Sequence, residues 1–400
     1  MVPDKWKKRM KILGIGVVLT AVAIWMPVRH ACADEEERTA ISEEELEDIQ
    51  EQIGNKILDK TDLNEIDQVL ENIFPQKKVT FQGVVEALLD GRDTISPQLL
   101  GDFIMDTLFH VVKANKSTLV YLLLIIIIAA VFTNFSEVFQ NQQIARTGFY
   151  LVYMLLITAC LHSFQMVMQE ITGSLKQLIT FMTVLSPAYF ICMSLAAGSV
   201  SAIAFYNIVL LLIFLVELVI LHFLLPLIHV CLMIQVLNFL SDEEYLSKFA
   251  ELLQTVIGWS LKTLLYLTTG ASVVQGILGP SVDAVKRSVF TKGAEMIPGL
   301  GDVFGGTAEI VLGTAVLMKN GVGMAGAVLV IAFCLVPVLN MGILTLMYKG
   351  LAALVQPVSD RRIVEAVSSV GDGYHMLLKV VGTTAVLFLI TIAVAAAATT

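Results

Sequence analysis

Apolar residues form long, nearly uninterrupted runs over the last two-thirds of this chain. Most of these runs are close to the ~20 residues that an α-helix needs to cross ~30 Å of hydrocarbon. The clear runs cover residues 117–136, 148–168, 178–197, 203–221, 223–240, 252–277, 322–356 and 375–397, and a weaker, glycine-rich run covers 299–318. The run 322–356 is long enough for two passes. The pattern predicts an all-α, polytopic helical membrane protein with seven or eight spans.

The N-terminus has a different pattern, which is typical of a secretory signal peptide. The basic stretch KWKKRMK (5–11) precedes an apolar run of about 15 residues (12–26) and then the tripeptide Ala31-Cys32-Ala33. We predict a signal peptide over residues 1–33, with Ala31 and Ala33 forming the cleavage site. An uncleaved anchor is the alternative. In both cases the basic residues stay in the cytoplasm, so the chain from Asp34 onward starts outside.

Residues 34–116 are acidic and show helical periodicity. They contain 20 acidic and 8 basic side chains, a net charge of −12, whereas the whole chain has a net charge of −9. Ile49, Ile53 and Ile57 recur every four residues, and similar apolar faces follow up to Pro97, which is suited to the first turn of a helix. We therefore predict a small helical extracytoplasmic segment. Its apolar faces pack together or on the bilayer surface, or they bind another extracytoplasmic protein.

Composition supports the membrane assignment and excludes other classes. The chain is 56% hydrophobic and only 15% charged, whereas soluble proteins have roughly 25% charged residues. No cluster of lysine and arginine indicates nucleic-acid binding. Four of the five cysteines lie in apolar runs without metal-ligand spacing, so we expect buried thiols, no metal site and no cofactor.

Prolines at equal spacing predict an internal repeat in the membrane part. The two pairs, each 39 residues apart, are Pro187 with Pro226 and Pro298 with Pro337. A Ser-Asp pair follows each second proline and opens a charged loop. Each proline is a candidate hinge or hairpin, and repeats of this kind are typical of transporters. The predicted organisation is two first transmembrane helices (117–169), membrane repeat 1 (170–278) and membrane repeat 2 (279–400). Their relative orientation stays open, with a preference for parallel repeats.

Charged residues within apolar runs are the candidate functional residues. Charges are costly inside a bilayer and usually face a bundle interior or a water-filled path. The candidates for an intramembrane polar path are Glu217, Lys262, Glu309 and Lys379. The alternative is that they form structural ion pairs within the bundle.

Catalysis has little support in the sequence. Gly299–Asp302 forms a G-x-G-D tetrapeptide of the kind found in intramembrane aspartyl proteases, but the other C-terminal aspartates lie in predicted loops. Paired carboxylates are required for that chemistry. No zinc-protease or serine-hydrolase motif and no phosphate-binding loop occurs. We expect no catalytic residue and no enzymatic activity.

Two stretches carry a resemblance to a known family: LSPAYFICMSLAAGSVSAIAFYNIVLLLI (185–213) and PGLGDVFGGTAEIVLGTAVLMKNGVGMAGA (298–327). With the signal peptide and the acidic segment, they resemble the stage III sporulation protein AE family of endospore-forming bacteria. The resemblance implies a subunit in the mother-cell membrane around the forespore, within a complex of the other stage III A operon proteins and the forespore protein IIQ. That complex would pass small molecules and support late forespore gene expression. A non-transporting scaffold is the alternative, and neither stretch assigns a role to any residue.

Overall fold

The computed structural model describes residues 64–73, 80–89, 97–135, 142–197, 199–239, 245–294 and 301–397. The chain divides into two compact units, Met1–Asp48 and Ile49–Thr400, and every described residue belongs to the second. The predicted cleavage site, Ala31 and Ala33, lies outside the described residues, as does Pro298. For Glu309 and Asp302 the structure describes the backbone alone.

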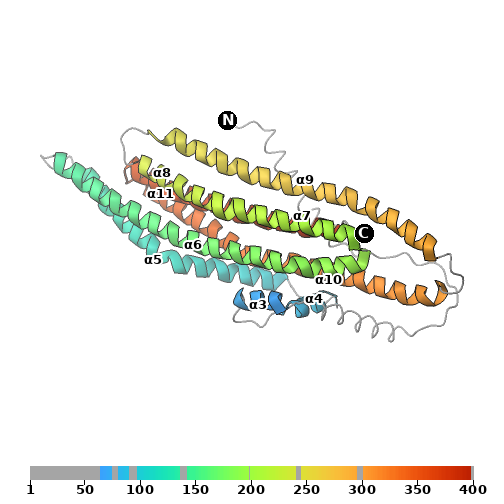
Figure 1. Cartoon of the computed structure of the whole chain (residues 1–400). Helices are drawn as coiled ribbons and strands as arrows, with labels where there is room; N and C mark the ends of the chain where they lie inside the picture. The colour runs from blue at the N-terminus through green and yellow to red at the C-terminus, as the bar shows by residue number, and fades with distance from the viewer. Residues whose placement is uncertain are drawn as a thin grey trace, which may run out of the picture. The chain divides into compact units, whose positions relative to one another are not determined.

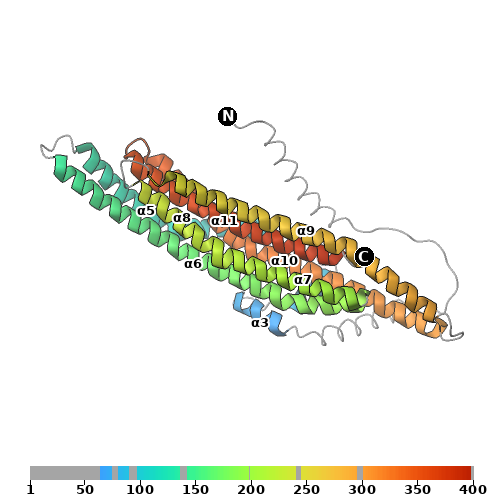
Figure 2. The same cartoon turned by 45° about the horizontal axis from the view of Figure 1, so that its top comes forward.

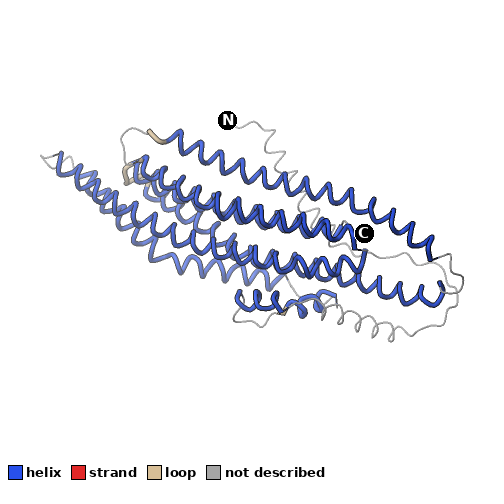
Figure 3. The backbone as a smooth tube through the Cα atoms, viewed as in Figure 1, coloured by secondary structure: helices blue, strands red, loops and turns tan. Residues whose placement is uncertain are grey.

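Every regular element in the described part of the chain is a helix, so the predicted all-α class is confirmed (Figure 3). Two short helices precede a bundle of long ones (Figure 1). The helices are α3 (Asn64–Ile73), α4 (Phe81–Leu89), α5 (Pro97–Phe135), α6 (Gln142–Ala197), α7 (Ser199–Glu217), the π-helix η1 (Leu218–Leu224), α8 (Leu225–Asn238), α9 (Ser247–Ala294), α10 (Gly301–Val355) and α11 (Arg361–Ala397).

Five helical stretches are long and apolar enough to cross a membrane, within the part that the structure describes. They are Thr107–Val131, Thr147–Ser194, Tyr206–Asn238, Val316–Val355 and Arg361–Ala393. A polytopic membrane protein is therefore supported, with fewer membrane-length helices than the predicted seven or eight. Two of the five stretches, Thr147–Ser194 and Tyr206–Asn238, each combine two predicted spans, and the predicted span 252–277, which lies in α9, is not among the five.

Helix α6 shows why the spans join. It combines the predicted spans 148–168 and 178–197, and the polar residues between them do not end it. Thr172 and Ser174 donate their hydroxyls to the carbonyls of Met168 and Glu170, one turn earlier, so both side chains are satisfied inside a helix. At 56 residues, α6 is about 84 Å long.

The proline positions do not behave alike. Helices α6 and α10 continue through Pro187 and Pro337, and Pro226 is the second residue of α8, directly after η1. In this π-helical turn the backbone N–H of Leu225 donates to the Ile220 carbonyl, five residues earlier. The chain reverses between α6 and α7, within the first proline pair, whereas α10 continues from Gly301 through Pro337. Pro298 lies outside the described residues, so the internal repeat stays a prediction.

Helix starts follow local side-chain chemistry. Asp360 precedes α11, and its carboxylate accepts the backbone N–H of Arg362 at 2.9 Å. Thr80 precedes α4 and accepts the N–H of Gly83 at 3.3 Å, while Asp67 of α3 accepts the N–H of Phe81 at 2.6 Å. These caps fix α3 and α4 as a pair. Helix α3 contacts α6, and α4 contacts α10 (Figures 1 and 2).

Candidate functional site

The predicted path residues lie on four different helices. Glu217 is the last residue of α7 and is half-buried. Lys262 on α9 and Lys379 on α11 are exposed. Glu309 belongs to α10, and its side chain is outside the described part. The intramembrane polar path therefore stays a prediction.

Contacts between helices place Glu217, Lys262 and Lys379 within one band of the bundle, about 12 Å deep along the helix axes. Helices α8 and α9 run antiparallel, with the Cys231 thiol 3.7 Å from the Ala250 carbonyl. Lys262 lies twelve residues after Ala250 on α9, and Val219 lies twelve residues before Cys231. Because the two helices are antiparallel, Lys262 is level with Val219, two residues from Glu217.

Helix α6 adds further residues to this level. The rings of Phe164 and His229 stack with centroids 6.3 Å apart on the antiparallel helices α6 and α8. Lys176 lies twelve residues after Phe164, and Glu217 lies twelve residues before His229, so these two residues are level with each other. Helix α11 runs parallel to α6, and the Ser163–Tyr374 contact places Lys379 level with Met168. Asn340 of α10 donates to Glu170 at 3.5 Å.

We define the polar girdle as these residues together with His222 of η1, which is exposed at the same level. Its members are Glu170, Lys176, Glu217, His222, Lys262, Asn340 and Lys379. They are exposed or half-buried, whereas the residues beneath them, such as Ile171, Leu175 and Ile220, are buried and apolar. The girdle is thus an outer band of charge around an apolar interior.

A second polar group is buried, and the sequence analysis did not predict it. The Tyr348 hydroxyl donates to Ser163 Oγ at 3.0 Å, and Ser163 Oγ lies 3.4 Å from the Tyr374 hydroxyl. These three residues, the hydroxyl cluster, join α10, α6 and α11. Both tyrosines are fully buried, so the mutual hydrogen bonds offset the cost of removing their hydroxyls from water.

Two glycines allow the helices to meet at the hydroxyl cluster. A Cβ on Gly373 would lie 2.9 Å from Phe164 Cε2 and 3.3 Å from Leu232 Cδ2. A Cβ on Gly371 would lie 2.9 Å from Lys349 Cγ. Between them, Asp372 pairs with Lys349 at 2.7 Å. The stretch Gly371–Tyr374 therefore combines close approach, an ion pair and a hydroxyl contact. A glycine on either side of an aspartate in a helical segment is the only sequence signal for it.

Lys319 is the most buried charged side chain among the described residues, at 0% exposed. It lies within α10, and its ammonium group donates to the Ala396 carbonyl at 3.2 Å, at the C-terminal end of α11. Free carbonyls at a helix C-terminus favour a cation, so Lys319 acts as a cap between α10 and α11.

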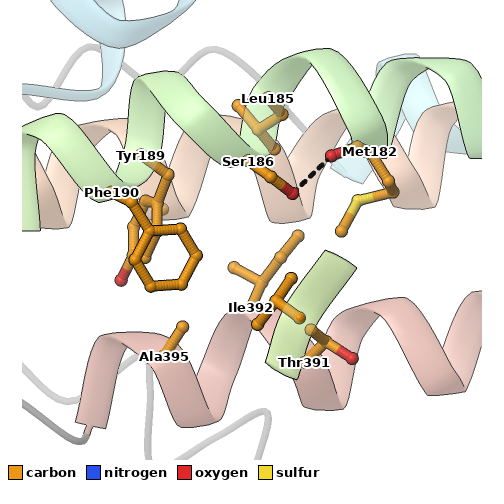
Figure 4. Close-up of a pocket in the computed structure, with 10 residues that line it drawn as sticks. Met182, Leu185, Ser186, Tyr189, Phe190, Thr391, Ile392 and Ala395 are labelled. Carbon is orange, nitrogen blue, oxygen red and sulfur yellow. Dashed lines mark hydrogen bonds between the residues drawn. The ribbon is translucent and has the colours of Figure 1, made fainter. Parts of the chain in front are cut away.

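The described part of the bundle contains an apolar pocket between α6, α7, α10 and α11 (Figure 4). Its empty volume is about 310 Å³, its open mouth included. Ile392 and Ala395 of α11 face Ser186, Tyr189 and related residues of α6 (Figure 4). The Ser186 hydroxyl donates to the Met182 carbonyl at 2.6 Å. A pocket so lined offers no route for a charged solute.

Long apolar helices around a largely apolar core, five of them with stretches of membrane-crossing length in the described part of the chain, define a multi-pass helical membrane protein. Comparison with known proteins makes this specific. A family model described as stage III sporulation protein AE matches residues 79–399. The chain is 24% identical over 315 residues to the stage III sporulation protein AE of Bacillus subtilis (strain 168), covering 78% of this chain and 79% of that protein.

The chain therefore belongs to the stage III sporulation protein AE family, and it is a membrane protein involved in sporulation. The resemblance noted from residues 185–213 and 298–327 is confirmed. The family description indicates no catalytic domain. No solved structure matches the chain.

Proposed function

We propose that this protein is the permease-like membrane subunit of a sporulation complex that links mother cell and forespore, passing small molecules and supporting late forespore gene expression. The observation that carries the proposal is the family match over residues 79–399, together with five membrane-length helices. The partners proposed from the family resemblance are the other stage III A operon proteins and the forespore protein IIQ. Membrane lipid surrounds the bundle, in the mother-cell membrane around the forespore, and the segment that follows a cleaved signal peptide begins outside the cytoplasm.

A non-transporting scaffold is the second candidate, and one observation favours it. The interior at the level of the polar girdle is apolar, and the described part of a single chain shows no polar passage. Transport would then require a path between chains. A scaffold would need only the outer surfaces.

Lys262 distinguishes these candidates. Its side chain is exposed, so Lys262→Gln removes a girdle charge without opening a cavity. Lys248→Gln is the matched control, because Lys248 is an exposed lysine on the same helix. Transport predicts that Lys262→Gln abolishes late forespore gene expression while the complex, recovered by affinity purification, still assembles.

The same measurements give the opposite result for a scaffold. Loss of assembly with Lys262→Gln and with Lys379→Gln, each in step with the sporulation defect, supports the scaffold and contradicts the transport proposal. Normal sporulation with both variants would show that the charges of Lys262 and Lys379 are needed neither for transport nor for assembly.

A further inference from the structure

One face of α9 carries an exposed line of residues with coiled-coil spacing. They recur at alternating intervals of four and three residues, and all are exposed except the half-buried Val256. Apolar residues at these intervals form the contact line between two paired helices. We call this line the α9 seam, and its residues are Leu252, Val256, Trp259, Thr263, Tyr266 and Gly270. Phe249 and Val273, three residues before and after it, continue the same spacing.

The α9 seam lies opposite the face that α9 packs on the bundle. Ile257, Leu261 and Leu264 are buried on that inner face, where α9 contacts α11, α8 and α7. With 3.6 residues per turn, the seam lies about half a turn around the helix from them. Both views show α9 along the outside of the bundle (Figures 1 and 2). The seam is therefore a helix face that no described part of the chain covers.

The seam is large enough to hold a partner. Trp259 is 74% exposed, Tyr266 72%, Leu252 56% and Phe249 48%. The exposed parts of the three aromatic side chains amount to about 400 Å² per chain. Two such seams, with Leu252 and Val273 included, would bury on the order of 1,000 Å², the lower limit of a specific interface.

Lipid alone is a poor match for this face. Helix α9 is not among the five described stretches that are apolar enough to cross a membrane, although its neighbours α8 and α11 contribute to them. Thr263 and Gly270 alternate with the large residues of the seam, and a Cβ on Gly270 would meet nothing within 4 Å. Small and hydroxyl-bearing residues on a membrane helix let another helix approach closely. The seam therefore fits a helix better than acyl chains.

The residues beside the seam fit a second copy of this chain. Copies inserted in one membrane have the same orientation, so their α9 helices would pair in parallel around a two-fold axis. In a parallel pair, the residue before one seam position faces the residue after the next seam position of the partner. Lys262 then lies against Leu267 of the other copy, and its apolar stem covers that leucine. Thr255 lies against Ser260 in the same way. The seam itself contains no charge, so no like charges meet.

We propose that two copies of this chain pair in parallel through the α9 seam, with Trp259 and Tyr266 at the centre of the contact. The pairing does not depend on whether the complex passes small molecules. It leaves the hydroxyl cluster and the apolar pocket, which lie on other helices, inside each copy.

Disulfide crosslinking tests the pairing in membranes of a host that lacks the other sporulation proteins. Leu252→Cys and Tyr266→Cys lie on the seam, and Gln254→Cys, exposed on the same helix but off the seam, is the matched control. The four described native cysteines are buried, and the parent protein gives the background. We expect a dimer from each seam variant on mild oxidation and none above background from Gln254→Cys. Equal dimer yields for all three variants, or no dimer from either seam variant, overturn the proposal.

Co-expression of the two seam variants tests the orientation. An antiparallel pair centred on Trp259 would bring Leu252 of one copy beside Tyr266 of the other. Crosslinking that occurs only when Leu252→Cys and Tyr266→Cys are mixed would therefore overturn the parallel arrangement. Crosslinking of each variant by itself supports it.

Truncation of the central side chain tests how much the seam contributes. Trp259→Ala leaves the fold of one copy intact, because the side chain is largely exposed. Loss of a central tryptophan should raise the dissociation constant of the dimer in detergent, measured by sedimentation, about tenfold or more. Gln254→Ala should leave the constant unchanged. An unchanged constant with Trp259→Ala contradicts the proposal.

Two further observations decide what occupies the seam. In sporulating cells, a Tyr266→Cys product that contains a different protein and no dimer would show that the occupant is not a second copy. In vesicles, Trp259 faces lipid when the protein is diluted to single copies, and pairing at higher protein content should shield it from lipid-borne quenchers. Quenching that does not change with protein content contradicts the pairing.

Discussion

The polar girdle and the hydroxyl cluster belong to the same bundle, but one is exposed and charged and the other is neutral and lies in the interior. The girdle holds charges of both signs on the outside, where Asn340 of α10 donates to Glu170 of α6. The hydroxyl cluster holds three neutral hydroxyls in the interior, and each contacts another helix. Exposed charge fixes where the bundle can sit in a membrane, whereas buried hydroxyls fix which helices meet. Stability should therefore respond to the cluster, and membrane position or function to the girdle.

The largest expected effect follows from removing the Phe164 ring, which packs beside the hydroxyl cluster. Phe164 is fully buried between Tyr374, at 5.3 Å between ring centroids, and His229. Phe164→Ala leaves a cavity and should cost about 3–5 kcal/mol of unfolding free energy. Denaturation of the purified protein in mixed micelles measures it. The exposed Phe249 on α9 is the control, and equal losses for both alanine variants would refute the difference between interior and surface.

A smaller effect is expected from filling the close approach at α11. Gly373→Ala places a methyl group 2.9 Å from the Phe164 ring, which should destabilise the bundle by about 1–3 kcal/mol. Gly382→Ala on the same helix meets nothing within 4 Å and should be neutral or stabilising by up to about 1 kcal/mol. The same micelle denaturation compares the two. A destabilised Gly382→Ala with an unaffected Gly373→Ala would mean that the helices do not meet here.

Removing one hydroxyl tests the hydrogen bonds themselves. Ser163→Ala takes away the acceptor of Tyr348 and should cost about 1 kcal/mol. Ser174→Ala, on the same helix, removes a hydroxyl that bonds only to the Glu170 carbonyl of its own helix, and it should have little effect. Thermal melting in detergent provides the comparison. If the two variants melt alike, the hydroxyl cluster contributes nothing to stability.

The smallest effect is expected at a surface ion pair. Lys248 and Glu251 are largely exposed and 2.8 Å apart. Their hydrogen bond raises the pKa of Lys248 and lowers the pKa of Glu251. Any stabilisation is therefore lost as the pH falls through the lowered pKa of Glu251, or as it rises through the raised pKa of Lys248. Lys248→Gln should leave the melting temperature near neutral pH unchanged, because exposed pairs contribute little. A marked drop that disappears in acid would show that the pair matters.

Apolar runs were enough to predict an all-helical membrane protein, because burial in lipid demands that composition. They could not show where helices end. Thr172 and Ser174 look like a polar break between spans, yet their hydroxyls bond within α6 and the helix continues. Prolines also did not mark helix ends, since α6 and α10 continue through Pro187 and Pro337.

The sequence was enough to select the candidate site residues, but not to predict which way their side chains point. Glu217, Lys262 and Lys379 stand out as charges in apolar runs, but whether each points inward or outward depends on neighbouring helices. The hydroxyl cluster was out of reach, because Ser163 lies 185 residues from Tyr348 and 211 from Tyr374. No local pattern links residues at such separations.

The central claim is that the polar girdle lies at the headgroups of a membrane, and Trp259, which is 74% exposed and one helical turn from Lys262 on α9, tests it most directly. Trp6 and Trp25 are replaced by phenylalanine, so Trp259 is the only tryptophan of the chain. In vesicles with lipids that carry a quencher at a shallow or a deep position, Trp259 fluorescence should be lost mainly with the shallow quencher. Stronger quenching by the deep label, or none by either, would contradict the account.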